Sequence, residues 1–149
     1  DLLVVADDDL APELRRALAL DLVALADRRP IAGDVELSAV RARDAAAPFV
    51  HPTPFTLHYG PDWREAIRRG ETDFAAERTD PDLAAHVTVA RARGVALLGP
   101  PPDVLFAPVP WEHYLDSVRA DLAWILEEEN ICDNPPYAVL NLCRVWELE

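Results

Sequence analysis

The chain lacks the features that would place it in a membrane or in a disulfide framework. Its 149 residues contain no apolar run long enough to span a bilayer, no signal peptide and no arginine-rich transit segment. The two cysteines, Cys132 and Cys143, have the spacing of neither a metal motif nor a disulfide framework. Because Cys143 lies in an apolar pattern, we expect a buried, reduced thiol in a cytoplasmic protein without membrane contacts.

Lysine and methionine are also absent, so every basic residue is an arginine, and the formal net charge is −13. Nucleic-acid binding needs cations that neutralise phosphates, so we expect no nucleic-acid partner. An acidic surface attracts cationic ligands, although it also simply keeps a protein soluble. Because the chain has no methionine and begins inside a strand pattern, we expect it to be part of a longer protein.

The four histidines show no metal-ligand spacing, and we expect each to make local hydrogen bonds. They are His51, His58, His86 and His113.

Two carboxylates stand beside apolar strand patterns. Asp1 opens the run over residues 2–6, and Glu36 sits within a second strand pattern over residues 35–40. Successive side chains of a strand alternate between faces, so Glu36 and Ser38 share one face. Ionised groups are rarely buried without a partner, which favours a shared acidic site that binds a divalent cation. A solvated edge strand is the alternative interpretation.

The remaining periodicities predict an α+β fold. A mixed β-sheet flanked by helices should occupy residues 1–109, and residues 110–149 should begin an α-helical domain after a proline-rich boundary. The predicted helices cover residues 12–27, 62–69, 80–94 and 111–128, with a last one from Tyr137, and further extended segments cover residues 55–59 and 95–98.

Three of these predictions name particular positions. The first helix should bury the stripe Leu14, Leu18, Leu22 and Leu25. The helix near residue 80 should begin with Asp80 as its cap and Pro81 in its first turn. The helix from Trp111 should bury the stripe Trp111, Leu115, Val118, Leu122 and Ile125.

The end of this last helix is unusually acidic. Trp124 shares a face with Asp121 and Glu128. Glu127, Glu128 and Glu129 crowd the C-terminus, where the helix dipole disfavours negative charge, and Asp133 follows. An aromatic ring among carboxylates suits a cationic, sugar-like ligand. A solvated helix end with Trp124 packed on a neighbour is the alternative.

An ordered set of segments carries a family resemblance. They read DLLVV at 1–5, VELS at 35–38, DPDLA at 80–84, AR at 90–91, VALLGP at 95–100, FAPVP at 106–110 and VLNLCRVW at 139–146. In this order the chain resembles the aminoglycoside 3''-adenylyltransferases and their relatives in the polymerase-beta-like nucleotidyltransferase superfamily. The resemblance implies Mg²⁺-dependent transfer of a nucleotide monophosphate, AMP from ATP, to a hydroxyl of an aminoglycoside-like cation.

The resemblance also implies roles for single residues. Asp1 matches the second Asp of a pair that holds magnesium on the nucleotide phosphates, and Glu36 matches the general base. Trp63 sits where the family places a Trp that lines the antibiotic site. Asp133 and Asn134 fall where the family has an Asp that contacts the drug, and we expect Glu129 to line the same substrate site.

The chain also departs from the family. The family's Gly-Ser loop and first Asp would lie upstream of Asp1, Val89 stands where the resistance enzymes have a Lys, and Asn134 replaces their Asp. These differences leave two alternatives open. The acceptor could be a protein partner, or the chain could be a non-catalytic interaction module that kept the fold.

Overall fold

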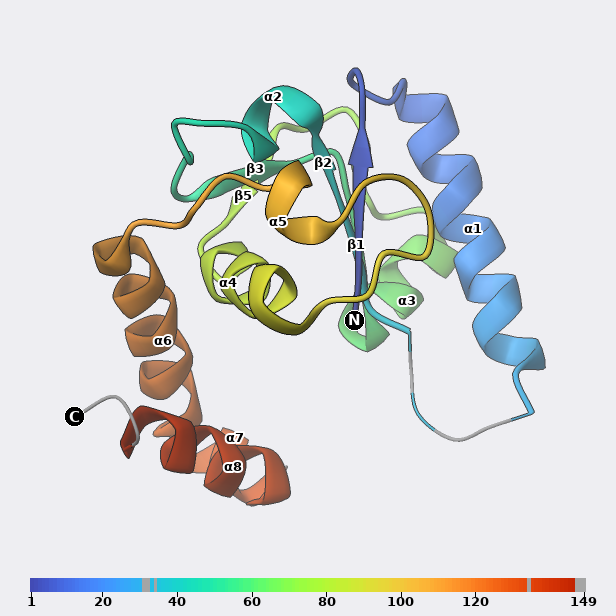
Figure 1. Cartoon of the computed structure of the whole chain (residues 1–149). Coiled ribbons are helices and arrows are strands. Elements are labelled where there is room, and N and C mark those ends of the chain that lie inside the picture. The colour runs from blue at the N-terminus through green and yellow to red at the C-terminus, as the bar shows by residue number, and fades with distance from the viewer. Residues whose placement is uncertain (31–32, 34, 134, 147–149) are drawn as a thin grey trace. The chain divides into compact units, whose positions relative to one another are not determined.

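The computed structural model describes the backbone of residues 1–30, 33, 35–133 and 135–146, without the side chains at positions 128, 129, 133 and 144–146 (Figure 1). Contacts gather the chain into two compact units. The first comprises Asp1–Val50 with Pro54–Thr79, and the second comprises His51–Thr53 with Asp80–Glu149. The domain division expected after residue 109 stays a prediction.

The first unit is built on a mixed three-stranded sheet, as the sequence predicted. Its order is β1 (Leu2–Ala6), β2 (Leu37–Arg41) and β4 (Leu57–Tyr59). Strand β1 pairs with β2 in parallel, beginning at Leu2 opposite Leu37, and β4 runs antiparallel to β2. The parallel pair brings the beginnings of β1 and β2 to the same edge of the sheet.

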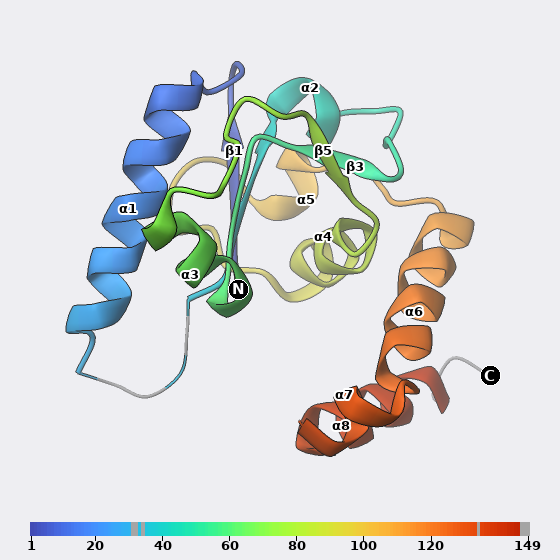
Figure 2. The same ribbon diagram turned by 180° about the vertical axis from the view of Figure 1, so that it is seen from behind.

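Two helices cover one face of this sheet, α1 (Pro12–Arg28) and α3 (Pro61–Arg69), as Figure 2 shows. The buried cluster between these helices and the sheet consists of Ala19, Val23, Ala39, Leu57, Tyr59 and Ile67. The predicted leucine stripe of α1 is therefore correct only at Leu22, which is partly buried and packs against this cluster. Leu14, Leu18 and Leu25 are exposed, because the smaller Ala19 and Val23 form the face that lies against the sheet.

The strand predicted over residues 55–59 is two short strands. Strand β3 (Thr53–Phe55) pairs with β5 (Arg78–Asp80) in a separate two-stranded sheet, whereas β4 joins β2. The break falls at Thr56, whose backbone N–H and side-chain hydroxyl both donate to the carbonyl oxygen of Ala39, at 2.8 and 3.1 Å. These two bonds replace the regular ladder at this residue.

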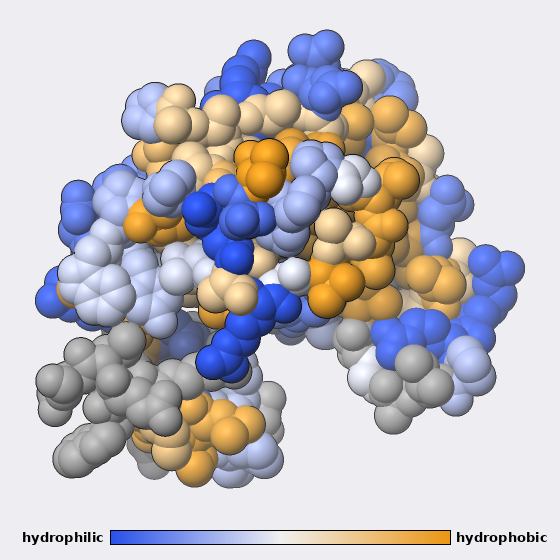
Figure 3. Space-filling view, viewed as in Figure 1, coloured by the Kyte–Doolittle hydropathy of each residue, from blue (hydrophilic) through white to orange (hydrophobic). Residues whose placement is uncertain are grey.

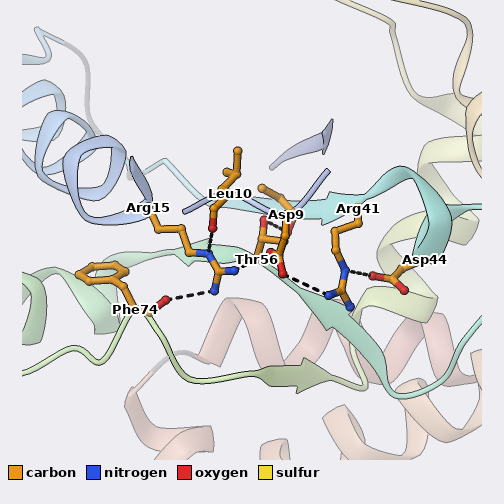
Figure 4. Close-up of polar contacts among 8 residues, drawn as sticks. Asp9, Leu10, Arg15, Arg41, Asp44, Thr56 and Phe74 are labelled. Atoms are coloured by element: carbon orange, nitrogen blue, oxygen red, sulfur yellow. Dashed lines mark hydrogen bonds and ion pairs between the residues drawn. The ribbon is translucent and has the colours of Figure 1, made fainter. Parts of the chain in front are cut away.

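A network of ion pairs lies where strands β1 and β2 of the first unit end (Figure 4). Arg15 of α1 is buried and donates to Asp9 at 2.5 Å and to the carbonyl oxygens of Leu10 and Phe74. Arg41, the last residue of β2, bonds Asp44 in the short helix α2 (Ala42–Ala45), and the hydrogen bond to Asp44 raises the pKa of Arg41. The network therefore lies at the carboxyl ends of β1 and β2.

The second unit is helical. Its helices are α4 (Leu83–Arg93), α5 (Pro102–Leu105), α6 (Trp111–Ile125), α7 (Glu128–Asp133) and α8 (Pro135–Trp146). Helix α4 contacts α5 and α6, and α6 contacts α8. None of the described helices combines the length and the apolar character that crossing a membrane requires. The extended segment expected over residues 95–98 has no regular strand.

The predicted start of α4 is two residues too early. The carboxylate of Asp80 accepts the N–H of Asp82 at 2.8 Å, so Asp80 forms a turn before the helix instead of capping it. Asp82 connects α4 to α6, because its carboxylate accepts the hydroxyl of Ser117 at 3.0 Å. Ser117 and Ile125 are the buried residues of α6, and Trp111 is exposed, so the predicted stripe is only partly correct.

The last helix exposes apolar surface. Val139 and Leu140 of α8 are 59% and 62% exposed, and Figure 3 shows hydrophobic surface in the region that Figure 1 labels α8. Cys143 and Cys132 are also exposed, so the prediction of a buried Cys143 thiol is wrong. The buried positions of α8 include Ala138 and Asn141, which lie on another side of the helix from Cys143.

Candidate active site

Asp1 and Glu36 lie next to each other at the beginning of the parallel strand pair. Each comes one residue before the first register pair, Leu2 opposite Leu37, and the N–H of Leu2 donates to the carbonyl oxygen of Glu36 at 2.8 Å. Both acidic residues are exposed. Strand β2 begins at Leu37, so Glu36 precedes the strand that was expected to contain it, yet its carbonyl still bonds β1.

The side chain of Glu36 lies on the face of the sheet opposite the core. Val35 and Leu37 pack against the cluster under α1 and α3, so the intervening residue points to the other face. On that face Ser38 and His58 stand opposite each other in the register, and the Ser38 hydroxyl oxygen is 2.9 Å from Nδ1 of His58. The strands thus bring a carboxylate, a hydroxyl and an imidazole to one surface.

Gly60 leaves space beside these groups. A Cβ at this position would lie 3.6 Å from Nε2 of His58 and 3.8 Å from Cγ of Glu36. The φ angle of Gly60 is −155°, an extended conformation that any residue adopts, so no backbone requirement selects glycine. We call the surface formed by Glu36, Ser38, His58 and Gly60 the acidic notch.

The notch contains three residues that the sequence reasoning did not assign to a site, Ser38, His58 and Gly60. The local hydrogen bond expected of His58 is present, to Ser38. The sequence signal that could have identified His58 is the alternation over Leu57, His58 and Tyr59. This alternation places only the side chain of His58 on the same face of the sheet as Glu36. Pairing of this segment with β2 was needed to bring His58 next to Ser38.

Trp63 lies in the first turns of α3 beside the notch. Its ring meets the rings of His58 and Phe55 edge to face, with centroids 5.4 and 6.3 Å apart. The guanidinium carbon of Arg78 lies over the Trp63 ring at 5.0 Å from its centroid. These side chains line an open pocket of the first unit, together with Thr56, Leu57, Thr72, Asp73, Phe74 and Ala76.

A carboxylate next to the notch suits magnesium. Asp1 lies beside Glu36 on the adjacent strand, and hard cations prefer carboxylate oxygens such as those of Asp1. Over the residues that the structure describes, no group of three or more His, Cys, Asp or Glu could hold a metal ion. Mg²⁺ commonly takes one or two carboxylates and completes its shell with water and substrate phosphates, so these donors fit an ion that binds with a nucleotide.

The other predicted substrate residues belong to the second unit. Asn134 lies outside the described residues, and so do the side chains of Glu129 and Asp133, although α7 contains both of those positions. Their expected contacts stay predictions. Val89, at the position of the family's Lys, is an exposed residue of α4.

Trp124 packs against a tyrosine, as its alternative interpretation expected. Its ring meets that of Tyr137 edge to face, with centroids 6.1 Å apart, and remains 47% exposed. The Tyr137 hydroxyl donates to Asp121 at 3.0 Å. Burial, followed by the hydrogen bond to Asp121, raises the pKa of Tyr137 to about 12. The carboxylate beside Trp124 is thus engaged with a neighbouring helix.

Comparison with known proteins agrees with this fold. Residues 104–148 match the family described as "Aminoglycoside adenylyltransferase, C-terminal domain". The structure is similar to spectinomycin adenyltransferase from Enterococcus faecialis, solved with ATP and spectinomycin. The TM-score is 0.80 at 18% identity, over 95% of this chain and 57% of that one. This likeness confirms the α+β nucleotidyltransferase fold.

Sequence relatives extend the comparison. The chain is 33% identical to an aminoglycoside (3'') (9) adenylyltransferase from Klebsiella pneumoniae, over 98% of this chain and 56% of the relative. It is 31% identical to one from Rhizobium radiobacter, over 98% of this chain and 54% of the relative. The chain thus spans about half the length of the relatives it matches. The predicted resemblance to the aminoglycoside adenylyltransferase family is therefore confirmed along nearly the whole chain.

Proposed function

We propose that the protein containing this chain transfers AMP from ATP to a hydroxyl group of an aminoglycoside-like cation, with the help of Mg²⁺. The observation that carries the proposal is the adjacency of Asp1 and Glu36 at the start of two parallel strands. The names of the relatives support the choice of reaction and of acceptor class.

In this proposal Glu36 is the general base. Its carboxylate takes the proton of the acceptor hydroxyl, and the hydroxyl oxygen forms a bond to the α-phosphorus of ATP. The bond from that phosphorus to the bridging oxygen breaks, and pyrophosphate leaves with the electron pair. Glu36 is exposed, so an acceptor oxygen can approach its carboxylate from solvent.

Asp1 is the proposed holder of the metal. Bound magnesium supplies positive charge that offsets the negative charge of the phosphates. Asp1 and Glu36 enter from adjacent strands with their backbones joined by the bond from Leu2 to Glu36. This arrangement keeps the residue that holds the metal and the residue that acts as base on adjacent strands, as a reaction between a bound nucleotide and a bound hydroxyl requires.

The acceptor is proposed to contact Trp63, Glu129, Asp133 and Asn134. A formal net charge of −13 favours a cationic acceptor through long-range attraction. Trp63 stands at the side of the notch, where it meets the ring of His58 edge to face. It can therefore bound the acceptor next to the hydroxyl that reacts.

The test uses the full-length protein with ATP, Mg²⁺, and either streptomycin or spectinomycin. We expect a product heavier than the antibiotic by one AMP residue, detected by mass spectrometry, together with release of pyrophosphate. A protein that labels itself or a co-purified protein instead would favour a protein acceptor. A folded protein that neither binds ATP nor modifies any acceptor would favour the non-catalytic module.

A further inference from the structure

The indole ring of Trp63 is already covered by a cation from its own chain. The guanidinium carbon of Arg78 lies 5.0 Å from the ring centroid, inside the distance of about 6 Å at which cation–π attraction acts. Arg78 is an exposed residue at the start of β5, and Trp63 belongs to α3. Both residues lie in the first compact unit, so the contact is internal to that unit.

The pocket around this pair is small. Its cavity volume is about 20 Å³, and Arg78 forms part of its lining. Pockets for drug-sized ligands usually enclose about 300–1,000 Å³. Because Arg78 is exposed, its side chain can move toward solvent and enlarge the pocket. As the structure stands, a ligand that stacks on this ring face must first displace the guanidinium.

The same ring also contacts two other aromatic rings. Phe55 and His58 meet Trp63 edge to face, and Trp63 packs against the buried cluster under α1 and α3. The face under Arg78 is thus the part of the ring on which the chain has placed a charged, mobile group. A planar guanidinium stacks on an aromatic face better than an ammonium does, which suits arginine to this position.

We propose that Arg78 is a specificity-determining residue. Its guanidinium covers the face of Trp63 on which a ligand would stack, and it disfavours acceptors that would place an ammonium group on that face. The inference rests on the proposed function and narrows its substrate class. The accepted molecule places an uncharged, hydroxyl-rich ring beside Trp63 and keeps its cationic groups elsewhere. An ammonium group over Trp63 would have to replace the guanidinium or lie beside a like charge. An uncharged ring can accept hydrogen bonds from the guanidinium N–H groups.

The experiment compares acceptors with and without ammonium groups on the full-length protein. Dissociation constants are measured by titration calorimetry for spectinomycin and streptomycin, and for derivatives of each acetylated on their amines. Four proteins are compared, the parent, Arg78→Gln, Arg78→Lys and Arg69→Gln. Arg69 is an exposed arginine at the end of α3, so its substitution removes the same charge from the same unit without touching Trp63.

We expect Arg78→Gln to strengthen binding of at least one charged antibiotic by about two- to fivefold, the size of one exposed cation–π contact. Its acetylated derivative should bind the two proteins equally. Arg78→Lys and Arg69→Gln should keep the parental ratio of charged to acetylated affinity.

Arg78→Gln protein that binds charged and acetylated forms in the parental ratio would overturn the role of Arg78 and leave the proposed transfer intact. A parent protein that binds neither antibiotic in any form would overturn both. If Arg69→Gln strengthened binding of the charged antibiotic as much as Arg78→Gln, the role of Arg78 would also be overturned, because the effect would then come from net charge.

Discussion

The N–H of Leu2 donates to the carbonyl oxygen of Glu36 at 2.8 Å, one residue before the register of the parallel pair begins. This bond sets Asp1 and Glu36 side by side at one edge of the sheet. The ion-pair network of Asp9, Arg15, Arg41 and Asp44 lies at the opposite ends of the same two strands. The proposed catalytic residues and the stabilising ion pairs therefore lie at opposite ends of the same strands. Their contributions to activity and to stability can be tested separately.

The first prediction concerns the space beside Glu36. Gly60→Ala should leave folding nearly unchanged, because the added methyl would make ordinary contacts of 3.6 and 3.8 Å in an extended backbone. The methyl would lie between His58 and Glu36, where the acceptor hydroxyl should approach. Misplacing a reacting group by about 1 Å can lower the rate by about 10²-fold. We expect turnover to fall toward that limit, measured by steady-state kinetics beside urea unfolding.

Parental turnover in folded Gly60→Ala protein would show that the acceptor does not use this space.

The second prediction concerns Arg15. Arg15→Met should lower the free energy of unfolding by about 3 kcal/mol, because Asp9 and the partly buried carbonyls of Leu10 and Phe74 would lose their donor. The matched control is Arg16→Met, since Arg16 is exposed and adjacent. It should change stability by less than about 0.5 kcal/mol. Equal urea midpoints for the two variants would contradict a stabilising network.

The third prediction is a pH dependence in the helical unit. Burial and the Asp121 hydrogen bond raise the pKa of Tyr137 from 10.0 to about 12, so folding favours the neutral phenol. Its contribution to stability is complete below pH 10 and is lost as the pH rises toward 12. Because Tyr137 is 40% exposed, solvent screens this contribution and the effect should be modest.

Ultraviolet titration of the phenolate, with Tyr137→Phe subtracted, measures this pKa directly. Asp121→Asn should lower it, because the neighbouring negative charge is removed. A Tyr137 that titrates near pH 10 in the folded protein would contradict the hydrogen-bonded arrangement.

The sequence predicted the parts of the fold that depend on local chemistry. Gly70 ends α3 with a φ of 72°, and the apolar runs at residues 2–6 and 35–40 predicted the strands β1 and β2. It did not predict which side of α1 is buried. Periodicity favoured the large leucines, whereas close packing on the sheet selected Ala19 and Val23. That choice depends on the shape of the partner surface, which no local pattern contains.

The sequence likewise predicted only those parts of the candidate site that have a local signal. Asp1 and Glu36 were recognisable as carboxylates next to strands, and the family resemblance gave them roles. His58 and Gly60 were not assigned, because their proximity to Glu36 arises from pairing between β2 and β4. The contact between Arg78 and Trp63 likewise joins residues from α3 and β5, whose distance in space is not encoded in their spacing along the chain.

The central claim is that Glu36 is the general base, and Glu36→Gln in the full-length protein tests it most directly. The substitution keeps the volume of the side chain and removes its ability to accept a proton. A general base typically contributes about 10²–10⁴-fold in rate, so we expect AMP transfer to fall by that factor. The urea midpoint should be unchanged, because Glu36 is exposed. Affinity for ATP should also be unchanged, because Asp1, and not Glu36, is the proposed holder of the metal that offsets the phosphate charge. Glu13→Gln, an exposed residue in the first turn of α1, is the matched control. Folded Glu36→Gln protein that transfers AMP at the parental rate would contradict the account.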